Sequence, residues 1–185
     1  ADLNYQFSYK ILYAADYGVP QMRKRLIVLG AREGKVPTHP EPTHRSFEDL
    51  RLFSYSKPIY VTCGDAISDL PLIVSGETVT EFDKPPQNAY QQRMRNGANC
   101  LYNHQASTHK QQTMDYYALV PAGGTWLDIP QHLRKRKQGI QRWPLDGLAR
   151  AITTEPTDFL HPVLDRIPTV RETARIQSFP DWFEF

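Results

Sequence analysis

Residues 7–30, F-S-Y-K-I-L-Y-A-A-D-Y-G-V-P-Q-M-R-K-R-L-I-V-L-G, predict how the chain begins to fold. Phe7 to Ala14 alternates apolar with polar residues and is rich in aromatic and branched side chains, which is typical of a strand. Leu26 to Gly30 is a continuous apolar run, which predicts a second strand that is buried on both faces. Gly18 and Pro20 lie between the two runs, so we expect a short connection and two antiparallel neighbours.

The composition favours an ordinary globular fold of mixed type. The chain has 185 residues, of which 40% are hydrophobic and 23% are charged, so it can bury a core. Its 15 prolines and 10 glycines are spread along the chain, which indicates many short elements joined by turns rather than a helical bundle. We therefore expect a loop-rich α+β fold.

Charge, cysteine content and hydropathy exclude several classes of protein. The formal net charge of +2 is too small for a strong general attraction to nucleic acid, so any DNA contact must come from local basic clusters. Cys63 and Cys100 are far apart and have no second thiol or histidine at metal-ligand spacing, so we expect no metal, no disulfide framework and an intracellular location. No apolar run approaches the roughly 18 residues of a membrane span, and no signal peptide is evident.

Beyond the two strands, the sequence predicts a long connection and four short helices. The stretch from Glu33 to Pro58 is rich in Pro, Thr and His and has no sustained periodicity. Helix starts are expected at Thr62, at Asn88, at Ser107 or Thr108, and at Thr169, and the corresponding stops lie before Pro71, at Gly97, near Leu119, and at Phe179-Pro180. The starts at Thr62 and Thr169 have the form of capping boxes.

Three donor side chains lie just before the second strand and are candidates for anion or base recognition. At a strand period of two, Gln21, Arg23 and Arg25 share one face. A guanidinium at the mouth of a buried strand needs an anionic or carbonyl partner, and its planar fork suits phosphate or a base edge. The alternative is an exposed strand rim with ordinary solvated charges.

Two further clusters of charge lie toward the carboxyl end. Arg171 and Arg175 are four residues apart on the last predicted helix, with Glu172 in its first turn, and could equally form a solvated helical face beside an aromatic cluster. A basic run is followed by a tryptophan and suits phosphate contacts, although it could also be a solvated charge run. This run comprises Arg134, Lys135, Arg136 and Lys137, followed by Arg142 and Trp143.

Taken in order, these segments resemble the second half of the DNA cytosine-5 methyltransferases. Y-G-V-P-Q-M-R-K-R-L at 17–26 resembles the family's Gln-x-Arg-x-Arg block, and P-T-V-R-E-T-A-R-I-Q-S-F-P-D at 168–181 resembles its Arg-Glu-x-x-Arg-x-Gln-x-Phe-Pro block. Between them A-I-S-D-L-P, Y-N-H, V-P-A-G-G-T-W and F-L-H-P resemble weaker landmarks around the family's variable target-recognition domain. The resemblance covers nearly the whole chain.

The resemblance implies an architecture in three parts. Residues 1–35 would be the last strands of a Rossmann-like, S-adenosylmethionine-dependent methyltransferase sheet. Residues 36–165 would be a small, loop-rich target-recognition domain with its connecting segments, and residues 166–185 would hold a helix that returns to the catalytic domain.

The resemblance also implies a reaction whose central groups lie elsewhere. Members of the family transfer a methyl group from S-adenosylmethionine to carbon 5 of a flipped cytosine, after a cysteine in a Pro-Cys context adds to carbon 6. Neither Cys63 nor Cys100 has that context. We therefore expect no nucleophile and no cofactor-binding residue in this chain, both ends of which look truncated, and expect an N-terminal half or subunit to supply them.

By position, the resemblance assigns roles to individual residues. Arg25 would reach the ring carbonyl of the target cytosine or an adjacent phosphate, while Arg23 and Gln21 would support the wall of the active site and the flipped backbone. A second set would brace the recognition domain against the catalytic sheet. This set comprises Thr169, Arg171, Glu172, Arg175 and Gln177.

Recognition of duplex DNA would lie between Asn103 and His161. Loops able to approach the bases are marked by Gly123, Gly124, Thr153 and Thr154, in addition to the basic run and Arg142. Relatives often have Thr-Ile or Thr-Leu where this chain has Ala151-Ile152 before Thr153, so which threonine contacts DNA stays open.

Three hypotheses follow. The first is a part of a DNA methyltransferase of the restriction-modification type that is inactive alone. The second is a non-catalytic, sequence-specific DNA-binding or regulatory module derived from the family. The third is a scaffold domain unrelated to DNA.

Overall fold

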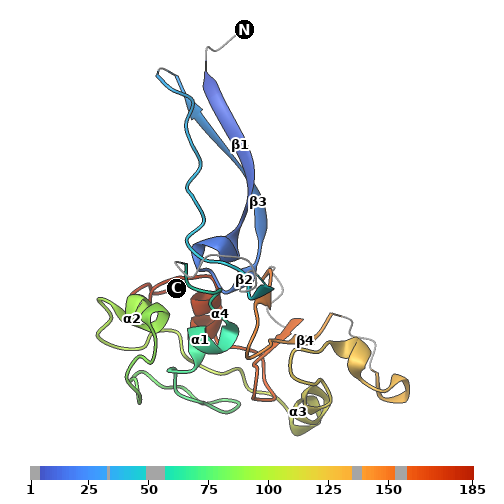
Figure 1. Cartoon of the computed structure of the whole chain (residues 1–185). Helices are drawn as coiled ribbons and strands as arrows, with labels where there is room; N and C mark the ends of the chain where they lie inside the picture. Colours follow the sequence, from blue (N-terminus) through green and yellow to red (C-terminus); the bar gives the residue numbers. More distant parts are fainter. Residues whose placement is uncertain (1–4, 33, 49–56, 135–138, 153–157) are drawn as a thin grey trace.

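A long two-stranded hairpin stands out from a body of short helices, short strands and loops (Figure 1). The computed structural model describes residues 5–32, 34–48, 57–134, 139–152 and 158–185. This mixture of short helices and small sheets confirms the α+β expectation. The described strands form three two-stranded sheets, so the Rossmann-like sheet stays a prediction.

The hairpin consists of β1 (Gln6–Tyr13) and β3 (Lys24–Ala31), which pair antiparallel over their whole length, as predicted. The prediction that the second strand is buried on both faces is wrong, since Leu26 and Val28 are both 60% exposed. The reason is that each strand of the hairpin pairs with the other alone, and no other described strand extends their sheet.

The connection between the two hairpin strands joins a different sheet. It contains the 3-10 helix η1 (Ala14–Tyr17) and the short strand β2 (Gln21–Met22). β2 pairs in parallel with β5 (Ala149–Arg150), far away in sequence, and the strand is interrupted at Arg23 before β3 begins. The expectation of one strand with Gln21, Arg23 and Arg25 on a single face is therefore wrong.

Three of the four predicted helices begin at the predicted caps. α1 (Cys63–Ile67) and α4 (Val170–Ile176) have complete capping boxes from Thr62 and Thr169. Asn88 caps α2 (Ala89–Arg95) by accepting a hydrogen bond from the backbone N–H of Gln91. These signals are local, because a cap needs only its own side chain and the backbone of the next turn.

The third helix begins later than predicted. α3 (Gln111–Ala118) starts after Lys110 rather than at Ser107 or Thr108. The hydroxyl of Ser75 donates to the carbonyl of Ser107 and accepts from the N–H of His109, 2.7 Å away. This distant partner occupies the backbone of the segment, so the segment does not join the helix.

The remaining elements are short. They are η3 (Trp126–Asp128), η4 (Gln131–Leu133), β4 (Gln141–Arg142) and β6 (Phe159–Leu160), and β4 and β6 pair in parallel. In the described part of the chain, no helix is long and apolar enough to cross a membrane.

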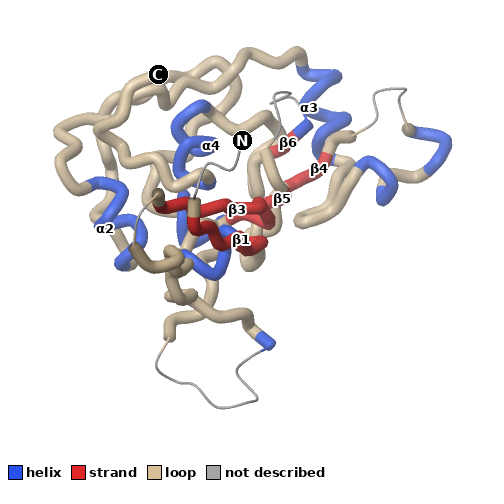
Figure 2. Tube along the Cα trace, turned by 90° about the horizontal axis from the view of Figure 1, so that it is seen from above, coloured by secondary structure: helices blue, strands red, loops and turns tan. Residues whose placement is uncertain are grey.

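Two apolar clusters form the interior of the body. The larger includes Ala66 of α1, Met94 of α2 and Ile176 of α4, together with Trp143. The smaller joins α3 and β6 to Ile129 and Ile140. Seen from above, α2 lies toward one end of the body, and α3, β4 and β6 lie toward the other (Figure 2). α1 packs against α4, although the predicted division at residue 165 assigns them to different units; that division stays a prediction.

Candidate functional site

The β2–β5 ladder brings the Gln-x-Arg-x-Arg block, which we call the first block, next to residues 149–152. In its parallel register Gln21 lies opposite Ala149 and Met22 lies opposite Arg150. Just beyond the ladder, Nη1 of Arg23 lies 3.5 Å from the carbonyl oxygen of Ile152, a long hydrogen bond. The block and the end of the predicted recognition region therefore meet in space.

The glycine loop at residues 121–125 lies beside β4. The N–H of Arg142 donates to the carbonyl of Gly124 at 2.9 Å, and Thr125 forms an isolated bridge with Gln141. A Cβ on Gly124 would lie 2.6 Å from a side-chain carbon of Pro121, and Gly123 has a φ of +69°. Glycine is needed at both positions, for close approach at one and for a left-handed backbone at the other.

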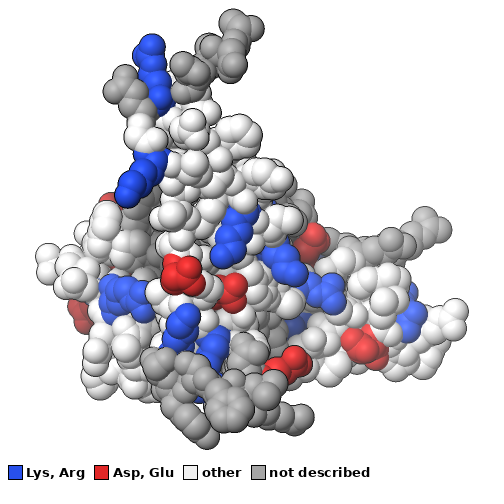
Figure 3. Space-filling model, turned by 45° about the horizontal axis from the view of Figure 1, so that its top comes forward, with Lys and Arg blue, Asp and Glu red and all other residues white. Residues whose placement is uncertain are grey.

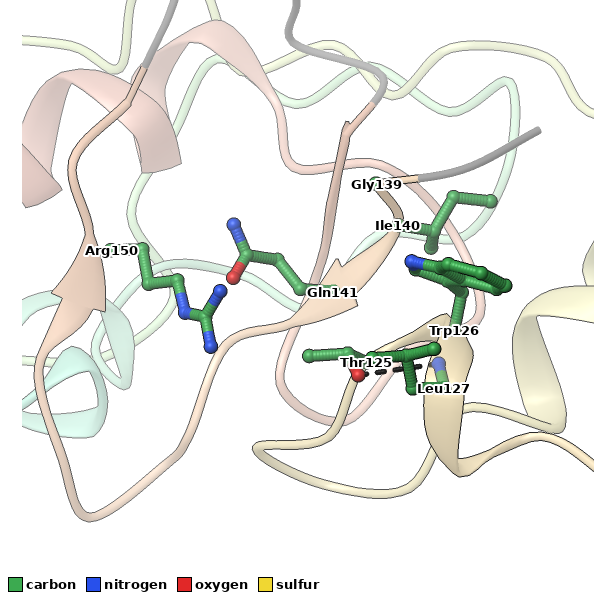
Figure 4. A pocket seen from close by; sticks show the side chains of 7 residues that line it. All are labelled: Thr125, Trp126, Leu127, Gly139, Ile140, Gln141 and Arg150. Atoms are coloured by element: carbon green, nitrogen blue, oxygen red, sulfur yellow. Dashed lines mark hydrogen bonds between the residues drawn. The ribbon is translucent and has the colours of Figure 1, made fainter.

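These segments surround a groove that we call the β4–β5 groove. It consists of two adjoining cavities of about 180 and 190 Å³, which share the side chains of Gln141 and Arg150. In the first cavity, the side chains of Arg150 and Gln141 reach toward one another from β5 and β4 (Figure 4). The other residues of the groove are Met22, Gly123, Thr125, Trp126, Leu127, Gly139, Ile140, Arg142, Trp143, Pro144 and Leu148.

The three residues of the first block differ in environment. Gln21 is almost fully buried, and its amide nitrogen has no hydrogen-bond partner among the described residues. Arg25 is exposed, and among the described residues its side chain donates only to the carbonyl of its neighbour Lys24, at 2.7 Å. The structure thus places the three near one end of the hairpin, with Arg23 and Arg25 accessible and Gln21 enclosed.

Arg142 has a structural role, which corrects the expectation that it contacts phosphate. It is 5% exposed, and its guanidinium donates to the carbonyls of Tyr117, Val120, His161 and Leu164 at 2.8 to 2.9 Å. It also forms an ion pair with Asp165 at 2.7 Å. All three of its nitrogens are engaged, so none is free to bind DNA.

The basic run is only partly described. Arg134 donates to the carbonyls of Leu127 and Ile129 and lies over the ring of Trp126, 5.6 Å from its centroid. Its guanidinium therefore holds the turn that carries Trp126. Lys135, Arg136 and Lys137 lie outside the described residues, and so do Thr153 and Thr154.

The start of α4 is fixed by a buried carboxylate. Glu172 accepts two hydrogen bonds from the guanidinium of Arg166, at 2.7 and 2.8 Å, and a third from the backbone N–H of Thr169. Burial by itself would raise the pKa of Glu172, but the hydrogen bonds and charge of Arg166 outweigh it and lower that pKa. Glu172 is therefore ionised in the folded chain.

Two buried histidines pack around this carboxylate. His104 lies between the hydroxyl of Thr169 and the carbonyl of Pro71, at 3.0 and 2.9 Å. Nδ1 of His161 accepts from the N–H groups of Val163 and Leu164. Burial, opposed by the charge of Glu172, lowers the pKa of His161 to about 4, so this ring is neutral at neutral pH.

The two arginines of α4 tie the helix to the rest of the body. Arg175 is fully buried; it binds Asp181 through two nitrogens at 2.5 and 2.6 Å and also binds Asp69 at 3.1 Å. Arg171 donates to the carbonyls of Tyr102, Pro180 and Phe183. The alternative of a solvated helical face is therefore wrong for this helix.

Cys63 does not have the environment of a nucleophile. Cys63 is fully buried, and burial raises the pKa of its thiol to about 12, although a backbone hydrogen bond involving Ala149 opposes this. The thiolate is the reactive form of cysteine, so Cys63 is unreactive at neutral pH. Cys100 is half-buried and is not in a disulfide. The described residues contain no group of three or more potential metal ligands.

Lys and Arg side chains are spread over the face that includes the hairpin base, with a few acidic residues among them (Figure 3). Arg150 is exposed, and its side chain makes no hydrogen bond or ion pair among the described residues. Arg150, Gln141 and Trp126 were not among the site residues predicted from the sequence. The available signal was weak: Arg150 is an isolated basic residue directly before Ala151-Ile152-Thr153, and only the fold brings it to the groove.

Comparison with known proteins places this geometry in a family. The sequence model of the C-5 cytosine-specific DNA methylases matches residues 1–185. The chain is 32% identical to the Type II methyltransferase M.DdeI of Desulfomicrobium norvegicum, covering 100% of this chain and 47% of that protein. It is also 32% identical to the Type II methyltransferase M1.HphI of Haemophilus parahaemolyticus, over 99% of this chain and 41% of that protein.

A plant protein and a solved structure extend the comparison. The chain is 29% identical to DNA (cytosine-5)-methyltransferase 2 of Arabidopsis thaliana, over 100% of this chain and 15% of that protein. A structure described as a prophage-encoded DNA modification methyltransferase (E. coli) superposes with a TM-score of 0.67 at 22% identity, over 98% of this chain and 52% of that one. The chain spans about half the length of the first two relatives, and it belongs to the C-5 cytosine-specific DNA methylase family.

Proposed function

We propose that this chain is the DNA-recognition portion and part of the active-site wall of a DNA (cytosine-5) methyltransferase. The whole enzyme would transfer a methyl group from S-adenosylmethionine to carbon 5 of cytosine in a specific duplex site. The observation that carries the proposal is the pairing of β2 with β5, because it joins the Gln-x-Arg-x-Arg block to the groove that contains Arg150. The reaction centre and the surface that recognises the DNA sequence would then lie side by side along the β2–β5 ladder.

The residues of the first block supply binding and positioning in this proposal. Arg25, accessible at the base of the hairpin, would donate to the ring carbonyl of the target cytosine or to an adjacent phosphate. Arg23, held near the carbonyl of Ile152, and Gln21, enclosed behind it, would shape the wall beside the flipped nucleotide. The accessible loop at Gly123 and Gly124 would approach the duplex.

The glycine in the first turn of α1 does not form a site for S-adenosylmethionine. A glycine in the first turn of a helix often provides room for a cofactor, but a Cβ on Gly64 in α1 would meet the carbonyl of Leu145 at 2.7 Å. This glycine packs against its own chain and leaves no space for a ligand. We propose that the methyl donor and the nucleophilic cysteine belong to a second, N-terminal half.

The exposed face of the hairpin supports the need for such a half. Phe7, Tyr9 and Ile11 are 61–69% exposed on one face of β1, opposite Gly30, Val28 and Leu26 of β3. An isolated two-stranded hairpin is only marginally stable in water and needs further strands or a helix to cover its apolar face. The N-terminal half would provide that cover.

A complementation assay tests this function. The chain is mixed with an N-terminal half that contains the Pro-Cys block, and transfer of a radiolabelled methyl group to duplex DNA is measured. Transfer that needs both parts is expected. A stable complex of the two that transfers nothing contradicts the proposal.

Two variants sharpen the assay. Tyr9→Ser should weaken association of the two halves, because it removes an apolar side chain from the exposed hairpin face, while Thr43→Ser, on an exposed loop residue, is the control. Arg25→Ala should mainly abolish methyl transfer. If it mainly abolishes DNA binding, and no half restores activity, the chain is instead a non-catalytic DNA-binding module.

A further inference from the structure

Arg150 differs from the other arginines of the groove and of the buried network. Arg142, which lines the same cavity, has every nitrogen engaged by carbonyls and by Asp165. Arg150 is exposed on β5, and among the described residues its guanidinium has neither a hydrogen bond nor an ion pair. Its guanidinium is therefore a planar group of unpaired N–H donors, carried by a backbone that the β2–β5 ladder holds in place.

The surroundings of Arg150 favour a base edge over a phosphate as its ligand. Phosphate sites usually combine several cations with backbone N–H groups. Among the residues that the structure describes, the one other charged side chain that lines the β4–β5 groove is Arg142, whose nitrogens are all hydrogen-bonded. The remaining walls are neutral or apolar and include the amide of Gln141 and the ring of Trp126 (Figure 4). An unpaired guanidinium beside the neutral amide of Gln141 suits the recognition of a base edge.

The position of Arg150 is also well defined. Its backbone pairs with that of Met22. The next residue after Met22 is Arg23, so Arg150 lies close to the proposed wall of the active site. A recognition residue mounted on a strand keeps its geometry better than one on a free loop.

We propose that Arg150 is a specificity-determining residue that donates two hydrogen bonds to O6 and N7 of a guanine in the recognised site. Gln141, beside it, contacts the adjoining base. This inference rests on the proposed function and adds to it a residue and a base. Guanine is the base whose major-groove edge presents two acceptors at the spacing of a guanidinium.

The test is selection from a pool of randomised duplex DNA with the 185-residue chain, at one salt concentration. The wild-type chain should enrich sites with guanine at a defined position. Arg150→Ala should lose the preference at that position by about fivefold or more and keep the others. Arg150→Lys should lose it as well while it retains binding to unselected duplex, because lysine keeps the charge and lacks the fork.

The controls distinguish this inference from the proposed function. Arg93→Ala, which removes an exposed arginine of α2, should leave the selected sequence unchanged, and thermal unfolding should show that all variants remain folded. A uniform loss of affinity and a smaller salt slope in Arg150→Ala would mean a phosphate contact and would overturn the inference, as would an unchanged preference. A wild-type chain that enriches no sequence contradicts the proposed function and the role of Arg150 together.

Discussion

Two arginines of α4, Arg171 and Arg175, and two arginines outside it, Arg25 and Arg150, have the same side chain and opposite surroundings. Arg171 and Arg175 are fully buried and are bound by carbonyls or carboxylates. Arg25 and Arg150 are exposed, and neither is bound by a carboxylate among the described residues. A buried guanidinium must be fully paired, because an unpaired buried charge is costly, whereas an exposed one remains available to a ligand. Pairing therefore separates arginines that hold the fold from arginines that can act on a partner.

The largest effect is expected from removing a buried guanidinium. Arg175→Ala leaves the carboxylates of Asp69 and Asp181, both buried, without this partner. We expect the free energy of unfolding to fall by about 3–5 kcal/mol, measured by denaturant unfolding. A loss below about 1 kcal/mol would show that water or other groups compensate and would remove the contrast between the two sets of arginines.

A pH titration of stability probes the same buried region. The pKa of His161 is about 4 in the folded chain against 6.5 ordinarily, so the unfolded chain binds a proton first as the pH falls. Stability from this residue is complete above pH 6.5 and is lost between pH 6.5 and 4, on the order of 3 kcal/mol.

The variant His161→Asn isolates this contribution. Its side-chain oxygen can still accept from the N–H groups of Val163 and Leu164, but it does not titrate. Because Glu172 and His104 also titrate nearby, the comparison is the difference in slope between the two proteins. Equal slopes of unfolding free energy across pH 4 to 6.5 would contradict the assignment.

A smaller loss of stability is expected at Arg142, which lines the groove but belongs to the paired set. Arg142→Ala removes the guanidinium donor from four carbonyls, of which that of Tyr117 keeps the backbone N–H of Val120, and the free energy of unfolding should fall by about 2 kcal/mol. The salt dependence of DNA binding should not change in the fraction that remains folded. If the slope of log affinity against log salt concentration decreases by about one, Arg142 contacts a phosphate after all.

The smallest effect on stability is expected at the exposed arginines. Arg25→Ala should change the free energy of unfolding by less than about 0.5 kcal/mol, since its one hydrogen bond is to the carbonyl of its own neighbour. In the proposed complementation assay, the same substitution should abolish methyl transfer. A destabilisation as large as that of Arg175→Ala would make Arg25 a structural residue.

Local signals in the sequence predicted the features that depend on a few consecutive residues. The capping boxes at Thr62 and Thr169 and the cap at Asn88 were correct, as were the two antiparallel strands. The predicted start of α3 was wrong, because its segment is held by Ser75 from another part of the chain.

The sequence by itself determined the α+β class, the helix caps and the two blocks that indicate the family, since each depends on neighbours along the chain. The tertiary structure decided which basic residues are available. Spacing alone grouped Arg142 with the DNA-binding run and passed over Arg150, whereas the fold encloses the first among carbonyls and leaves the second free beside β2. Burial and hydrogen-bond pairing depend on residues distant in sequence, and for an arginine they determine whether its charge is used inside the protein or offered to a ligand.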